Sequence, residues 1–423
     1  MADNSLPQTV VSCETIVEIQ SNGAVEAPFS AIISKIPRFP LNLKGFGTDR
    51  GYIAPRVVSI GPYYHGDPKL REMEEFKCTA VHHFFKGSPE KQDKYKEKMI
   101  SPIASDARGY YDVLEGISDN ELCNIMLADG CFLLQFLDYM TGGTSPEEDK
   151  WLGPKIQQHY MNIMGDMMLL ENQIPWPVIE GLMDQRGLTT ERIAHWLTRG
   201  LNDNWSKDDK AEIPKNWKPS HLLSLLHFCK VGSKNLPEPT DKKLSAVFTG
   251  AAELAEMGMK LEACNTKLFS DISIEGHFFG KLSLMPLSLD PSSASWILNL
   301  AAFEMCMATN FGASNYVNAY LSVVALLIEK EDDVCVLRTK RIVTSSMSNK
   351  ETLKFFKGLA PVLMPGVAYL LFTQQLEDFK RKRWMRIAIY RFFYTNAKAI
   401  ATVLSIIGVL AGIFKTLLSL KQK

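Results

Sequence analysis

The sequence predicts a mainly α-helical protein with a small β-hairpin element (α+β), in which a large helical body precedes one C-terminal transmembrane helix. Apolar residues that recur every three or four positions predict the helices of the body, and the clearest set is Leu122, Ile125, Met126, Leu133, Leu134 and Leu137. Alternating apolar and polar residues between positions 267 and 289 predict the hairpin. An uncharged apolar run near the C-terminus predicts the membrane span.

Composition divides the chain into four parts. Residues 1–28 are polar and we expect them to be disordered, while residues 29–379 form the helical body. Residues 380–398 are a basic and aromatic juxtamembrane segment, and residues 399–420 are the transmembrane helix. A body of this length can hold one large domain or two.

Helices are predicted wherever the helical period of apolar residues persists. They begin near residue 69 and include 122–137, 156–172, 189–201, 220–228, 244–259, 292–305, 316–328 and 333–342. The segment Ile174-Pro175-Trp176-Pro177 closes one helix, because proline ends a helix and can open the next. Ser292 or Ser293 is the predicted N-cap after the hairpin. The apolar stretch 358–372 contains two prolines and is predicted to be core rather than a second span.

The predicted span begins with Ala399–Phe414, sixteen residues without a charged side chain. A helix rises about 1.5 Å per residue and a bilayer core is ~30 Å thick, so a crossing needs roughly 20 residues. Extension to Leu420 gives 22 residues but includes Lys415, whose side chain can bend toward the head groups, as can that of Lys398. Two alternatives stay open, namely a buried helix of the body and a helix lying in the membrane plane.

A basic and aromatic segment precedes the span. From residue 380 to the C-terminus there are ten Lys or Arg and no Asp or Glu. Such side chains suit the head-group layer and are attracted to anionic cytoplasmic lipid, although an ordinary solvated helix is the alternative. The residues predicted to meet the membrane interface are Lys380, Arg381, Lys382, Arg383, Trp384, Arg386 and Arg391. Seven basic residues before the span and three after it predict a single-pass protein with its body in the cytosol.

The charge distribution excludes one class of partner. The chain has 47 basic and 47 acidic residues, but the tail holds ten of the basic ones, which leaves the first 379 residues with 37 basic against 47 acidic. An acidic body is unsuited to nucleic-acid binding. The N-terminus lacks the basic start and long apolar core of a secretory signal. The eight cysteines are scattered without CxxC spacing, as expected of reduced thiols in the cytosol.

No motif predicts a metal or a cofactor. The segment Gly276–Lys281 approaches a phosphate loop, but its spacing is one residue short and Leu282 stands where Ser or Thr is needed. His82 and His83 are adjacent, so on a helix their side chains point about 100° apart. The HExxH zinc motif does not occur in the sequence.

Several ordered segments resemble the plant domain-of-unknown-function 247 family. Tyr52–Gly66, YIAPRVVSIGPYYHG, is similar to the family signature Y-x-P-x-V-V-S-I-G-P-Y-H-H-G, with Tyr64 in place of the first His. Further resemblances are the M-E-x-x-K element at 73–77, MLADGCF at 126–132, DMMLLENQIP at 166–175 and NLAAFE at 299–304. The motif residues that we single out are Pro55, Ser59, Gly61, Pro62, His65, Asp129, Gly130, Asp166, Glu171, Asn172, Gln173, Pro175, Asn299 and Glu304.

The resemblance implies a mainly helical plant membrane protein with a cytosolic body. No enzymatic activity is established across that family. Some of its members are implicated in reproductive recognition, including grass pollen self-incompatibility, and others in stress or defence responses. We therefore expect a noncatalytic, membrane-anchored protein that acts in recognition or signalling through a protein partner.

The alternative hypothesis is a membrane-tethered enzyme that uses three carboxylates. Asp129, Asp166 and Glu171 lie among apolar neighbours on predicted helices, where burial can raise a carboxyl pKa and permit acid–base chemistry. In the structural interpretation, Asp129 or Asp166 accepts hydrogen bonds from backbone N–H groups, and Glu171 pairs with a base such as Arg56. The side-chain amides of Asn172 and Gln173 then satisfy a helix end before Pro175. We favour the structural interpretation, because a carboxylate in an apolar run must find partners. An enzyme would need all three to converge on an open pocket.

Overall fold

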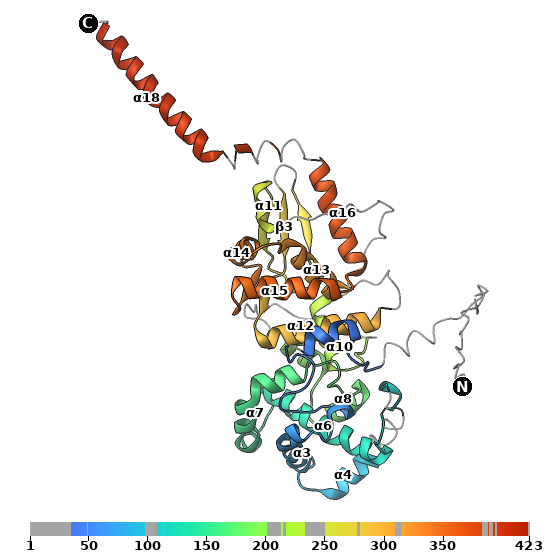
Figure 1. The fold of residues 1–423 in the computed structure, drawn as a ribbon. Coiled ribbons are helices and arrows are strands. Elements are labelled where there is room, and N and C mark those ends of the chain that lie inside the picture. The colour runs from blue at the N-terminus through green and yellow to red at the C-terminus, as the bar shows by residue number, and fades with distance from the viewer. Residues whose placement is uncertain are drawn as a thin grey trace, which may run out of the picture.

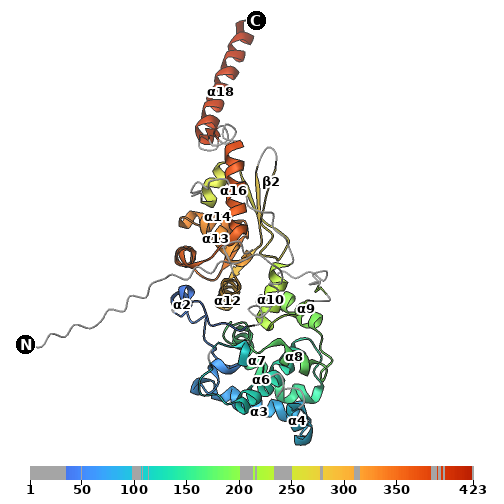
Figure 2. The same cartoon turned by 90° about the vertical axis from the view of Figure 1, so that its right-hand side faces the viewer.

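Helices stack in two lobes along the length of the body (Figures 1 and 2). The structure is a computed structural model, and it describes residues 35–48, 50–97, 108–112, 114–200, 217–232, 250–276, 280–308, 315–382 and 396–421, with isolated positions between these ranges. The segment 1–28, predicted to be disordered, lies outside the described residues. Most of the described residues are helical, as the sequence predicts.

The first half of the chain supplies the lower lobe in Figure 1. Its elements are α2 (Leu41–Thr48), η1 (Pro62–Tyr64), η2 (Pro68–Leu70), α3 (Arg71–Phe84), α4 (Pro89–Tyr95), η4 (Arg108–Tyr110), α6 (Asp119–Met140), α7 (Pro146–Asp166), α8 (Trp176–Met183), α9 (Thr190–Gly200) and α10 (Leu222–Val231). The central helix is α6, which contacts α3, α7 and α8. Its N-cap Ser118 accepts a hydrogen bond from the Glu121 N–H, and acidic residues in its first turn favour the positive end of the helix dipole.

The second half supplies the upper lobe and the tail. Its elements are α11 (Ala251–Glu256), β1 (Lys260–Ala263), β2 (Ser273–Glu275), β3 (Lys281–Leu284), β4 (Leu287–Leu289), α12 (Pro291–Met307), α13 (Tyr316–Leu327), α14 (Glu331–Thr339), β5 (Val343–Ser345), α15 (Asn349–Leu359), η5 (Ala360–Val362), α16 (Gly366–Lys382) and α18 (Ala397–Lys421). The predicted hairpin is confirmed as β2 and β3, which pair antiparallel with Ile274 opposite Leu282.

Two further strand pairings are parallel. β3 also pairs with β1, which gives a sheet in the order β1-β3-β2, and β4 pairs with β5. Neither pairing follows from the sequence pattern, because three- and four-residue strands are too short to show an alternation and their partners come from distant segments.

The helix α12 joins the two lobes. It contacts α2, α7 and α10 on the side of the first lobe, and α13 and β4 on the side of the second. Its apolar side chains from Ala294 to Met305 are buried, and they belong to one core cluster that runs through both lobes. The carboxylate of Asp290 accepts a hydrogen bond from the Ser293 N–H at 2.8 Å, so this aspartate caps the helix instead of Ser292 or Ser293.

Two predicted helix ends are wrong. The helix predicted to reach residue 172 ends at Asp166, because the residues that follow form turns whose carbonyls bind side-chain amides. The helix predicted to reach Ile342 ends at Thr339, and the chain then enters β5. Within the predicted helix 244–259, the helical part of the described residues is α11.

One helix among the described residues, α6, is both long and apolar enough to cross a membrane, and 83% of its apolar window is buried inside the body. The segments α15–η5 and α16 are together long and apolar enough to cross a membrane, but the chain bends by 115° between them, which agrees with a role in the core. In the tail, the described apolar stretch Ile400–Ile413 is shorter than the roughly 20 residues that a membrane crossing needs. Its length alone therefore does not establish the predicted transmembrane helix.

Candidate functional site

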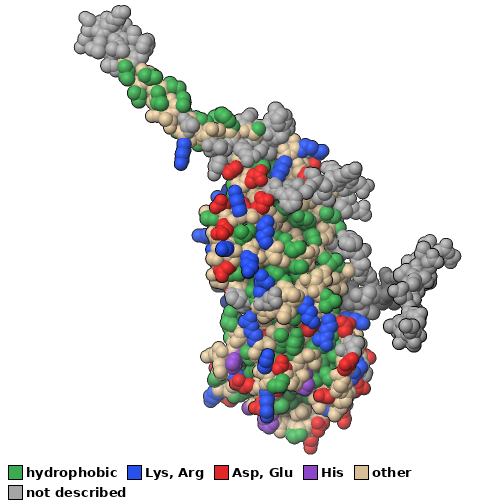
Figure 3. Space-filling model, in the orientation of Figure 1, with side chains coloured by type: hydrophobic (Ala, Val, Ile, Leu, Met, Phe, Trp, Pro, Cys, Tyr) green, Lys and Arg blue, Asp and Glu red, His purple; other side chains and the backbone are tan. Residues whose placement is uncertain are grey.

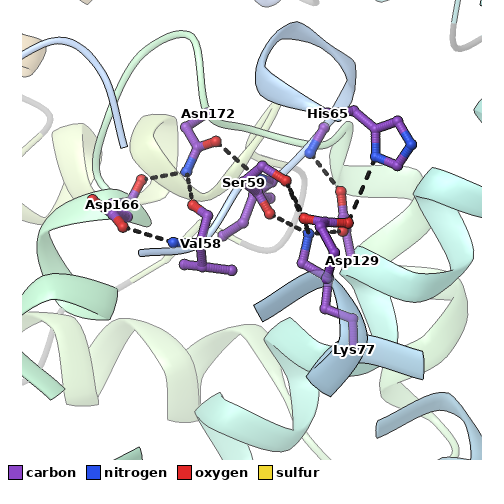
Figure 4. A network of polar contacts seen from close by, with 10 residues as sticks. Val58, Ser59, His65, Lys77, Asp129, Asp166 and Asn172 are labelled. Carbon is purple, nitrogen blue, oxygen red and sulfur yellow. Dashed lines mark hydrogen bonds and ion pairs between the residues drawn. The ribbon is translucent and has the colours of Figure 1, made fainter. Parts of the chain in front are cut away.

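Most of the motif residues meet around one irregular segment of main chain, residues 56–61, in the first lobe (Figure 4). The backbone N–H groups of Arg56, Val57 and Val58 donate to the carboxylate of Asp166 at 2.9, 2.8 and 2.9 Å. Asp166 is the last residue of α7 and is buried. One carboxylate thus satisfies three consecutive N–H groups that have no strand or helix partner.

Two more side chains continue this arrangement along the segment. Asn172 accepts from the Ile60 N–H at 2.7 Å and donates to the Val58 carbonyl at 3.1 Å. Asp129, from the middle of α6, accepts from the Gly61 N–H at 2.7 Å. We call Asp129, Asp166 and Asn172 the main-chain clamp, because all three bind backbone groups of residues 56–61.

Gly61 is required at the end of the clamped segment. Its φ is +86°, a conformation that L side chains rarely adopt. A Cβ atom placed on it would overlap the carbonyl oxygen of Gln173. The next residue, Pro62, opens η1 and fixes the chain as it leaves the clamp.

Lys77 lies beneath the clamp and supplies the cation that pairs with Asp129 (Figure 4). Its ammonium is 2.6 Å from Asp129 Oδ1 and 2.6 Å from Glu74 Oε1, and it donates to the Ser59 carbonyl at 2.5 Å. The Ser59 hydroxyl donates to Glu74 at 2.5 Å, and His65 Nδ1 lies 3.6 Å from the other Glu74 oxygen. Glu74 and His65 are partly exposed, whereas Ser59, Lys77 and Asp129 are buried.

Burial dominates the electrostatics of the clamp carboxyls. Desolvation raises the pKa of Asp129, and the ammonium of Lys77 is the largest opposing influence. Desolvation also raises the pKa of Asp166 to about 6, against the three backbone N–H groups that favour its ionised form. These shifts follow from packing and need no catalytic purpose.

Glu171 binds a second part of the N-terminal region. It accepts from the Phe39 N–H at 2.8 Å and from the Tyr64 hydroxyl at 3.0 Å. Its charged neighbour is Arg38, with Nη1 3.5 Å from Oε2. The predicted basic partner is therefore present, but it is Arg38 and not Arg56, whose side chain reaches the Gly51 carbonyl.

The remaining residues of this motif close the end of α7 and open α8. Gln173 Nε2 donates to the carbonyls of Met167 and Leu169, and its Oε1 accepts from the Leu223 N–H. Pro175 is the N-cap of α8. Gly130 on α6 lets α8 approach closely, since a Cβ there would lie 2.5 Å from Leu182 Cδ1.

Asn299 and Glu304 on α12 connect the lobes. Asn299 accepts from the Leu170 N–H at 2.8 Å and donates to the Tyr52 carbonyl at 2.8 Å. Glu304 accepts from the Val317 and Asn318 N–H groups at 2.9 and 3.0 Å, and His227 Nε2 lies 2.9 Å from it. These side chains again bind main chain across long sequence separations.

The three carboxylates of the enzymatic hypothesis are not brought together in the hollow beside the clamp. A shallow hollow beside the clamp is lined by Gly51, Ala54, Arg56, Met161, Asn162, Gly165, Asp166, Leu169 and Ser295, and neither Asp129 nor Glu171 is among them. Each of the three is buried and accepts hydrogen bonds from the protein itself. Among the described residues, no group of His, Cys, Asp and Glu side chains has an arrangement that could hold a metal ion.

Two partners in the network were not identified as site residues from the sequence. Lys77 and Glu74 belong to a motif-like element, but their functional contacts depend on α6 and on residue 59. A signal did exist, because Lys77 lies at helical spacing from the buried residues Met73 and Ala80. A lysine on the buried face of a helix indicates an internal carboxylate partner.

The predicted membrane-interface residues divide into two groups. Lys380, Arg381 and Lys382 form the end of α16, so the predicted boundary after residue 379 falls inside a helix of the body. Arg381 Nη2 lies 2.9 Å from Asp378 Oδ1, and burial lowers the pKa of Lys380. Arg383, Trp384, Arg386 and Arg391 lie outside the described residues.

The tail helix α18 projects away from the body in both ribbon views (Figures 1 and 2). Its large apolar side chains lie in the open, as Figure 3 shows. More than half of the surface is exposed for Val403, Leu404, Ile406, Ile407, Val409, Leu410 and Ile413. The alternative interpretation from the sequence, in which this helix is buried in the body, does not agree with this exposure.

Comparisons with known proteins find relatives of one kind. The sequence profile of a family described as "plant protein of unknown function" matches residues 36–411. The UPF0481 protein At3g47200 of Arabidopsis thaliana is 26% identical, over 86% of this chain and 81% of that protein. A second UPF0481 protein of Arabidopsis thaliana, At3g02645, is 25% identical over 41% of this chain and 33% of its own. No solved structure matches the chain.

Proposed function

We propose that this chain, which belongs to the plant family of unknown function called DUF247, is a noncatalytic protein that α18 holds at a membrane and that recognises or signals through a protein partner. The observation that carries the proposal is the exposed apolar surface of α18. The signalling would be of the kind that the family resemblance implies, in reproductive recognition or in stress responses.

The exposed side chains of α18 support the membrane part of the proposal. Monomeric soluble proteins rarely expose large contiguous apolar surfaces, and such surfaces indicate contact with a membrane or another protein. Between Ile400 and Ile413 the helix carries no charged residue, and seven of its large apolar side chains are exposed on it. A helix also satisfies its own backbone hydrogen bonds, as a lipid environment requires.

The clamp supports the noncatalytic part. A general acid or base must reach a substrate proton through a hydrogen bond. The carboxylates of Asp129 and Asp166 accept hydrogen bonds from backbone N–H groups, and Asp129 also pairs with Lys77. Ser59, a hydroxyl in the same network, is fully buried. A function in holding the fold of the first lobe accounts for these contacts.

The orientation is inferred from charge. Seven basic residues precede the apolar run and three follow it, which favours a cytosolic body and contact with anionic lipid. The acidic body favours a protein partner over nucleic acid.

Deletion of residues 399–423 tests the anchor. We expect the full chain to sediment with membranes and resist carbonate extraction, and the truncated chain to remain in the supernatant. The truncation leaves the body and α16 intact. Carbonate-resistant sedimentation of the truncated chain would contradict the proposal.

The sequon Asn204-Trp205-Ser206 tests the orientation. We expect no glycosylation of Asn204 during synthesis in the presence of microsomes, and we expect glycosylation of a sequon added after Lys423. The reverse pattern would place the body in the lumen. Proximity labelling by the full chain, with the truncated chain as control, would then identify the protein partner.

A further inference from the structure

We propose that Lys415 ends the membrane-embedded part of α18, so that this helix fits a bilayer with a thin hydrocarbon core. The inference rests on the proposed membrane anchoring and adds the kind of bilayer. It follows from the spacing of the charged residues along a single continuous helix.

The helix α18 runs without interruption from Ala397 to Lys421. Lys398 lies in its first turn, and the next charged residue is Lys415. The sixteen uncharged residues between them span about 24 Å at 1.5 Å per residue. A typical hydrocarbon core is ~30 Å thick, so this stretch is several ångströms short.

A deeper register that runs to Leu420 would match a thicker bilayer, but it carries Lys415 into the hydrocarbon. In that register the lysine lies five residues, or about 7.5 Å, inside the far boundary. A buried lysine opposes insertion more strongly than a few leucines favour it, although bending toward the head groups reduces the difference. We therefore place Lys415 at the far head-group layer.

The lipid has to accommodate the difference in length between α18 and the hydrocarbon core, because the described body does not cover this helix. Among the described residues, no side chain of the body covers the apolar face of this helix, and a Cβ atom placed on Gly408 would have no atom within 4 Å. A helix packed in a bundle can have its depth set by its neighbours. An isolated short helix instead thins the bilayer or extends its flanking lysines toward the head groups, and each of these costs free energy that a thin bilayer avoids.

The test uses the full chain and vesicles of phosphatidylcholine with a fixed fraction of phosphatidylserine. One vesicle set has fourteen-carbon monounsaturated chains and the other has twenty-two-carbon chains. We expect the carbonate-resistant fraction to be about fivefold greater with the short chains, since mismatch has a modest cost per ångström. The substitution Lys415→Leu, which extends the uncharged run to Leu420, should remove or reverse this preference.

Lys421→Leu is the matched control, because it removes the same charge beyond the proposed boundary. We expect this variant to keep the preference for short chains. Equal insertion of the original chain in both vesicle sets, or an equal response of the two variants, would overturn the thickness inference while leaving the anchor in place. Binding that high salt abolishes in every vesicle would instead refute the anchor itself.

Discussion

The ammonium of Lys77 and the carboxylate of Asp129 lie 2.6 Å apart where water does not reach, with side chains that are 1% and 2% exposed. Burial of the two charges costs free energy, which their mutual attraction and their other hydrogen bonds offset. Lys77 also donates to the Ser59 carbonyl, and Asp129 also accepts from the Gly61 N–H. The pair therefore fixes α3 and α6 to the same segment of main chain.

Lys77→Met should destabilise the protein strongly. It leaves the buried carboxyl of Asp129 without its cation, so we expect a loss of about 3–5 kcal/mol in the free energy of unfolding. Urea unfolding of the full chain in detergent measures this loss. Lys69→Met, on an exposed lysine of η2, should change it by less than about 0.5 kcal/mol. Equal effects of the two variants would contradict the role of the pair.

Gly61→Ala should destabilise more than the same change at Gly66. Both residues have positive φ, at +86° and +79°, so alanine introduces backbone strain at each. At Gly61 the new methyl group would also overlap the Gln173 carbonyl, whereas no atom lies within 4 Å of the position at Gly66. We expect more than about 2 kcal/mol at Gly61 and about 1 kcal/mol at Gly66. Thermal unfolding of both variants measures the difference.

Asp166→Asn tests the clamp itself. Asparagine keeps one accepting oxygen, but its NH₂ group cannot accept, so either the Arg56 N–H or the N–H groups of Val57 and Val58 lose their acceptor, and we expect a loss of about 3 kcal/mol in the free energy of unfolding. Hydrogen exchange should accelerate at the amides that lose their acceptor. The control is Asp67→Asn, because asparagine caps a helix as well as aspartate does. Unchanged exchange at all three of residues 56, 57 and 58 would show that Asp166 does not hold them.

His221 predicts a pH dependence. Burial lowers its pKa to about 3, below the value of 6.5 for an exposed histidine. The unfolded chain thus binds more protons between these values, so the contribution of His221 to stability is complete above pH 6.5 and falls as the pH drops. The slope is about 1.4 kcal/mol per pH unit once the unfolded histidine is protonated.

His221→Asn isolates this contribution. His221 caps α10 by accepting from the Ser224 N–H, and asparagine can replace that acceptor without titrating. The raised pKa of Asp166 gives an opposite slope between about pH 4 and 6, but that group is common to both proteins. We expect the difference in unfolding free energy between the two proteins to change from pH 7 to pH 5. A constant difference would refute the assignment.

Local sequence patterns were sufficient for several parts of the site and insufficient for others. Asp129 and Asp166 stand out as carboxylates in apolar helices, and such residues need internal partners. Their partners were not readable, because the Asp166 contacts cross about 110 positions and depend on how α7 meets the N-terminal segment. The pairing of Glu171 with Arg38 instead of Arg56 has the same cause.

The local sequence pattern also could not predict where α7 ends. The apolar period continues past Asp166 to Leu170, and it predicts a helix there. The chain turns instead, because the side chains of Asn172 and Gln173 donate to the carbonyls of Asp166 and Met167. The same two side chains also bind the main chain of Val58 and Leu223 in other segments. Side-chain amides that satisfy backbone groups in this way compete with the helix.

Recognition of the main chain by the clamp has a consequence for how this region can vary. Every amino acid except proline offers the same amide group, so the clamp itself sets no requirement on the side chains at positions 56, 57, 58 and 60. Insertions and deletions are different, since one residue gained or lost would move each amide away from its acceptor. The clamp therefore depends on the spacing of these amides along the chain.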